Sequence, residues 1–183
     1  MGDKIRISFG FYIFLALLIL LLPIQWWLGA LLAALIHEGF HVLAILLCRG
    51  DILSVTVTGL GAKIDASPMS TGKQVFCVLA GPVGSFSCLI ASECFPELAL
   101  CGFVQGAYNL LPIYPLDGGR ALGCICPAPV CKGIEWFTMV ILTGASLWLI
   151  VQNREVGAMF LISACYPVIQ RKISCKEGIL AVQ

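Results

Sequence analysis

The chain has 183 residues, of which 60% are hydrophobic and only 11% are charged, and its formal net charge is +1. About a quarter of the residues in a typical soluble domain are charged, so the composition excludes an ordinary soluble protein and indicates a single integral membrane domain over residues 1–183. The near-neutral charge, with no dense basic cluster, excludes a nucleic-acid partner. The ten cysteines are scattered mainly through apolar stretches, so a secreted disulfide scaffold is also excluded.

The apolar runs predict an all-α polytopic membrane protein with about six transmembrane helices. The first run follows Lys4 and Arg6, and because no small-residue cleavage site follows it, we interpret it as a retained span rather than a signal peptide. Trp26 and Trp27 are expected to anchor the chain at the membrane interface before it crosses back. The predicted spans lie near residues 7–24, 28–48, 74–92, 98–111 (followed by a broken segment over 112–120), 134–151 and 156–169.

The second predicted span contains the only two histidines of the chain, in His37-Glu38-Gly39-Phe40-His41. Residues four apart share one face of a helix, so both imidazoles can bind a common atom, with Glu38 beside them. This H-E-x-x-H pattern is typical of zinc hydrolases, in which the carboxylate takes a proton from water. The alternative is a helix that merely carries polar residues, which the high cost of ionisable groups at membrane depth disfavours.

Between the second and third spans, residues 49–73 have a different composition. The segment Ser54-Val55-Thr56-Val57-Thr58 alternates with the period of a strand, and Gly59 and Gly61 supply turn positions. We predict a short β-hairpin at the membrane surface, whose edge could bind an extended peptide, with a plain connecting loop as the alternative.

The third span contains Ala80-Gly81-Pro82-Val83-Gly84-Ser85. Small residues at this density let helices approach closely, so we expect this helix to pack against the one that carries the histidines.

The fourth span contains Gly102-x-x-x-Gly106 and runs into Asn109-Leu110-Leu111-Pro112, then Leu116-Asp117-Gly118-Gly119-Arg120. Prolines and paired glycines predict a broken helix, which is tolerated at membrane depth where it is buried in protein or lines a wet cavity. Asp117 is therefore the candidate for a third zinc ligand, and a carboxylate that caps the following helix is the alternative. Cys124, Cys126 and Cys131 follow at spacings that match none of the usual zinc patterns, which leaves a small metal or redox cluster as a minor alternative.

Basic residues predict the orientation of the six spans. With the N-terminus in the cytosol, ten of the eleven lysines and arginines lie on the cytosolic side and only Arg154 lies outside. This topology puts both termini and the Asp117 segment on the cytosolic side. His37 then lies about 16 Å from Cys48 along the helix axis, about halfway through a core of about 30 Å.

The two motifs together resemble those of the site-2 protease family of intramembrane zinc metalloproteases, H-E-x-x-H in one span and N-x-x-P-x-x-x-L-D-G in another. The resemblance covers roughly residues 28–126, and two motifs in the right order are far more specific than either alone. The most similar branch is the bacterial six-span type of the stage IV sporulation protease, which processes a pro-sigma factor. That branch usually continues into a CBS domain and another branch carries a PDZ domain, and this chain is expected to have neither.

The resemblance implies a metalloendopeptidase that binds one zinc ion (Zn2+) per chain through His37, His41 and Asp117, with Glu38 as general base and Asn109 as a hydrogen-bond partner of the substrate or oxyanion. It also implies a bacterial cell membrane, a transmembrane protein substrate such as a sigma-factor precursor or an anti-sigma factor, and a regulatory membrane protein as a further partner. Two rival functions stay open. A non-catalytic zinc-binding scaffold has no need of Glu38, and a transporter usually shows an internal repeat, which this sequence lacks.

Overall fold

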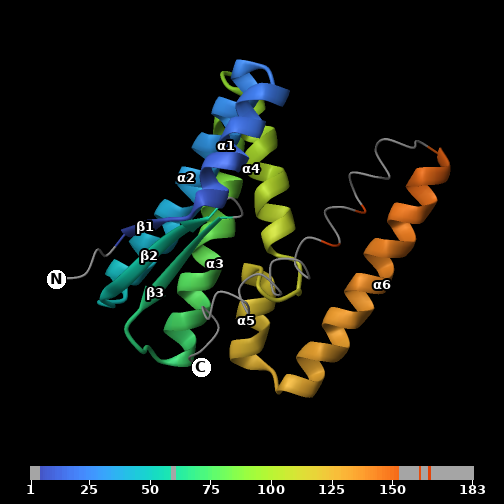
Figure 1. Cartoon of the computed structure of the whole chain (residues 1–183). Coiled ribbons are helices and arrows are strands. Elements are labelled where there is room, and N and C mark those ends of the chain that lie inside the picture. The colour runs from blue at the N-terminus through green and yellow to red at the C-terminus, as the bar shows by residue number, and fades with distance from the viewer. Residues whose placement is uncertain (1–4, 59–60, 153–160, 162–164, 166–183) are drawn as a thin grey trace. The chain divides into compact units, whose positions relative to one another are not determined.

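The computed structural model of the chain describes residues 5–58, 61–152, 161 and 165 (Figure 1). The chain forms two compact units, which we describe separately: residues 1–110 and residues 111–183. The sixth predicted span, 156–169, lies outside the described residues except for positions 161 and 165.

Three helices of the first unit, α2 (Ile24–Leu47), α3 (Thr71–Ser87) and α4 (Pro96–Asn109), pack against one another (Figure 1). A 3-10 turn, η1 (Cys88–Ala91), extends α3. The buried positions of α2 recur mostly every three or four residues and so form one face of the helix: Gly29, Ala33, His37, His41, Ala44 and Ile45. Several of these residues are small, so α3 and α4 can approach α2 closely. The two histidines are buried as a result. The expectation that the third span packs against the histidine-bearing helix is confirmed.

A glycine makes the contact between α2 and α4 possible. A Cβ atom on Gly29 would lie 3.1 Å from the backbone of Glu97 and Leu98. At that distance a side chain at position 29 would require the α4 backbone to move away by a few tenths of an ångström, so the glycine there favours the close approach of the two helices.

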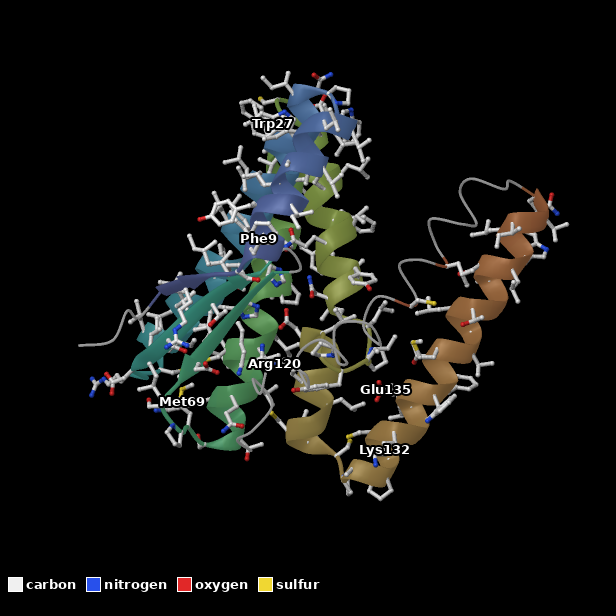
Figure 2. The ribbon with its side chains drawn as sticks, in the orientation of Figure 1. Phe9, Trp27, Met69, Arg120, Lys132 and Glu135 are labelled. Carbon is white, nitrogen blue, oxygen red and sulfur yellow. The ribbon has the colours of Figure 1, made fainter. Side chains whose placement is uncertain are left out.

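The first helix, α1 (Phe9–Leu21), is shorter than the predicted span. At 1.5 Å per residue its 13 residues cover about 20 Å, less than the hydrocarbon core of about 30 Å. Ser8 caps its N-terminus by accepting a hydrogen bond from the Gly10 N–H. The second helix begins at Ile24, directly after Pro23, so Trp26 and Trp27 belong to its first turn rather than to a connecting loop. Trp27 and Met69 lie at opposite ends of this unit (Figure 2).

The predicted hairpin is part of a larger, mixed sheet, and here the sequence-based prediction of a hairpin alone is wrong. Strands β2 (Ile52–Thr58) and β3 (Gly61–Ala66) are antiparallel, with Val57 opposite Ala62. A third strand, β1 (Ile5–Ile7), pairs in parallel with β2 and gives the order β1-β2-β3. This strand includes Ile7, the residue at which the first apolar run begins. Three residues are too few to show an alternating pattern, so the sequence carries no signal of this strand.

The second unit contains α5 (Asp117–Ile125) and α6 (Ala128–Gln152). Residues 111–116 precede α5 without helical structure, as the prolines predict, but the glycine pair Gly118-Gly119 lies inside α5 rather than in the break. A Cβ atom on Gly119 would lie 2.5 Å from the Ile113 carbonyl oxygen, so only glycine allows this approach of the backbone.

Three helical segments are long and apolar enough to cross a membrane: Ile24–Leu47, Thr71–Ala91 and Ala128–Gln152. They carry exposed apolar side chains such as Leu43, Val83 and Trp136, which suit contact with lipid. These segments support an integral membrane protein. The count of six spans is not confirmed within the described residues, because α1 and α4 are shorter.

Candidate metal centre

The two histidines meet at the interface of α2 and α3. His37 and His41 are 3% and 8% exposed, and their Nε2 atoms lie 3.2 Å apart. Two nitrogens bound to one zinc ion at about 2.0–2.1 Å and a tetrahedral angle are about 3.3–3.4 Å apart. The separation of the histidine pair is therefore close to that of two nitrogens bound to one metal ion.

Backbone and side-chain partners on α3 hold the other ring nitrogens. His41 Nδ1 lies 2.8 Å from the Cys77 carbonyl oxygen, and because a carbonyl only accepts, Nδ1 carries the hydrogen and donates. The lone pair of His41 is consequently on Nε2, the nitrogen that faces His37. His37 Nδ1 lies 2.8 Å from the Ser85 hydroxyl, which can donate or accept. Metal-binding histidines typically have such partners on the nitrogen that does not bind the ion.

Gly81 lets the backbone of α3 approach the two Nε2 atoms closely. A Cβ atom at this position would overlap His41 Nε2 and lie 2.8 Å from His37 Nε2. A side chain at position 81 would therefore collide with the imidazole rings, and only glycine lets the backbone of α3 pack this closely against them.

Gly84, about one turn further along α3, faces Phe40 of α2. A Cβ atom there would lie 2.8 Å from the Phe40 Cβ atom. The sequence predicts Gly81 and Gly84 only as packing residues.

Cys77 and Ser85 provide the histidine partners, and each lies four residues from Gly81. The three positions therefore share one face of α3. This spacing becomes informative only once α3 is placed against α2, so sequence reasoning missed both partners.

Glu38, the predicted general base, lies beside the sheet. Its Oε1 atom accepts a hydrogen bond from the Ala62 backbone N–H at 3.2 Å. Ala62 belongs to β3, an outer strand of the sheet, so this N–H points away from β2. The sequence predicts strands near the membrane surface but gives no sign that their edge touches the carboxylate.

Asp117 belongs to the second unit, where it is the first residue of α5. Its Oδ1 atom lies 3.7 Å from Arg120 Nη1, one turn along the same helix. The residue at the N-cap is Leu116, so Asp117 is not the cap that the alternative interpretation proposed.

Asn109 is the last residue of α4, and its Nδ2 donates to the Gln105 carbonyl oxygen at 3.1 Å. Its predicted contact with a substrate stays a prediction. Cys124, Cys126 and Cys131 form no group that could hold a metal ion among the residues that the structure describes.

Comparison of the whole chain with solved structures finds a site-2 protease from Methanocaldococcus jannaschii, with a TM-score of 0.61. The chain shares the fold of that protease. The alignment covers 91% of this chain and 89% of the archaeal protease, at 19% sequence identity. No protein-family model and no curated protein matches the sequence. At this identity the likeness to the archaeal site-2 protease establishes the fold alone.

Proposed function

We propose that this chain is an intramembrane zinc metalloendopeptidase that cuts a membrane-bound protein in or near a transmembrane segment. The observation that carries the proposal is the buried pair of Nε2 atoms, 3.2 Å apart, beside a glutamate on the same helix and within a site-2 protease fold. A carboxylate next to two imidazoles is the arrangement that zinc hydrolases use.

His37, His41 and Asp117 would hold the ion. Two imidazoles and one carboxylate are a donor set that could hold a metal ion, and three protein ligands leave a position open, as in catalytic rather than structural zinc sites. The ion would supply Lewis-acid activation of a water molecule and of the scissile carbonyl.

Glu38 takes a proton from the attacking water and delivers it to the departing amine. Its hydrogen bond to the Ala62 N–H keeps the carboxylate on the side of α2 that faces β3. Asn109 donates a hydrogen bond to the substrate backbone or to the developing oxyanion.

A substrate helix must unwind before its peptide bonds can be cut, because their N–H and C=O groups are hydrogen-bonded within the helix. The outer edge of β3 offers backbone groups that an unwound segment can pair with, next to Glu38. The substrate class is a protein with a membrane-spanning segment, and a sigma-factor precursor or an anti-sigma factor is the first to test. The proposed location is a bacterial cell membrane, with the site open to the cytosol.

Comparison of membrane proteomes tests this function. Cells that express the wild-type chain are compared with cells that express Glu38→Gln, and Glu93→Gln, an exposed carboxylate outside the site, is the matched control. We expect at least one membrane protein to accumulate uncut only in the Glu38→Gln cells. Identical proteomes in all three strains would favour the alternative of a non-catalytic zinc-binding scaffold.

A further inference from the structure

Ser85 is a fully buried polar residue that the predicted site does not include. It is 0% exposed, and its hydroxyl lies 2.8 Å from His37 Nδ1. A buried hydroxyl is retained at little cost only where it has a hydrogen-bond partner, and here that partner is a predicted metal ligand.

The two glycines of α4 also lie against Ser85. A Cβ atom on Gly102 would lie 2.6 Å from the Ser85 carbonyl oxygen, and one on Gly106 would lie 3.0 Å from the Ser85 Cβ atom. The Gly102-x-x-x-Gly106 face of α4 therefore fixes where Ser85 can be.

The partners of the two histidines differ in one respect. His41 donates to a backbone carbonyl, whose position the α3 helix itself determines. The partner of His37 Nδ1 is instead a side-chain hydroxyl. Ser85 can accept from Nδ1–H only while its side chain keeps this position relative to His37.

We propose that Ser85 is a positioning residue for His37, and that Gly102 and Gly106 hold it there. Ser85 accepts from His37 Nδ1–H, which leaves the lone pair of His37 on Nε2, the nitrogen that faces His41 Nε2. This inference rests on the metal binding proposed above.

The affinity of the full-length, detergent-purified chain for Zn2+, measured by competition with a chromophoric chelator, tests the role of Ser85. We expect Ser85→Ala to bind about 10–100-fold more weakly than wild type, as is typical when the partner of a ligand histidine is removed. Ser85→Cys, with a weaker hydrogen-bonding group, falls between the two. The matched control is Ser87→Ala, which removes a hydroxyl that bonds to the Gly84 carbonyl oxygen on the same helix.

The role of α4 is tested with Gly106→Ala, whose added methyl group presses on Ser85. The control is Gly72→Ala on α3, where a Cβ atom meets nothing within 4 Å. With Co2+ in place of zinc, we expect the visible absorption bands to shift in Ser85→Ala and Gly106→Ala but not in the two controls, because ligand orientation changes the spectrum.

Equal zinc affinity and equal Co2+ spectra in wild type and Ser85→Ala would overturn the role of Ser85 while leaving the proposed function intact. A wild-type chain that binds no metal would overturn both. If Ser85→Ala fails to fold, as judged by circular dichroism, Ser85→Cys decides the question, and wild-type affinity in that variant overturns the proposal.

Discussion

His37 Nε2 and His41 Nε2 lie 3.2 Å apart across one turn of α2, and Gly81 of α3 faces the gap between them. This relationship joins the sequence motif to the packing of two helices. The histidines belong to α2, and the absence of a side chain at Gly81 lets α3 pack against their rings.

Gly81→Ala is expected to abolish zinc binding, because the added Cβ atom overlaps His41 Nε2. Gly72→Ala on the same helix is the control and should bind normally. The measurement is the zinc content of purified protein by atomic emission. A Gly81→Ala protein with a full equivalent of zinc would show that His41 binds the ion without a glycine at position 81.

Asp117→Ala is expected to weaken zinc binding by more than the roughly 10–100-fold loss typical of a group that only orients a ligand. The control is Asp51→Ala, which removes an exposed carboxylate. Competition with a chromophoric chelator measures both affinities. Unchanged affinity in Asp117→Ala would exclude this residue as a ligand.

Gly84→Ala is expected to destabilise the packing of α2 against α3 by about 1–3 kcal/mol, the usual cost of overpacking. The added Cβ atom would overlap Phe40 Cγ and lie 2.7 Å from Phe40 Cδ2, two ring atoms that Phe40→Ala removes. Thermal unfolding in detergent measures the effect, and in the double variant with Phe40→Ala the two losses should not add. Additive losses would mean that the two residues are not in contact.

Ile64→Pro is expected to slow cleavage while leaving zinc content unchanged. N–H groups alternate along a strand, so the Ile64 N–H lies on the same edge of β3 as that of Ala62, where a substrate strand would pair. The control is Ile64→Ala, which keeps the N–H but shortens the side chain. Equal rates in the two variants would argue against pairing of the substrate with this edge.

The sequence predicts the parts of this molecule that depend on local patterns. The four-residue spacing of His37 and His41 predicts that both lie on one face of a helix. The small residues around Gly81 predict that the third span packs closely against that helix. The helix break before Asp117 follows from its prolines.

Other features depend on contacts between distant segments and could not be predicted. Strand β1 is too short to show a period, and Ser85 meets His37 across 48 positions of the chain. The Ala62 N–H reaches Glu38 only because β3 folds beside α2. A backbone group carries no sequence signal at all.

The central claim, that Glu38 is the base of a zinc endopeptidase, is tested most directly by cleavage of a membrane substrate by purified Glu38→Gln at equal zinc content. General acid–base catalysis contributes about 10²–10⁴-fold, so we predict that the variant retains its zinc and cuts at least about 100-fold more slowly than wild type. Cleavage at the wild-type rate by the zinc-loaded variant would contradict the account.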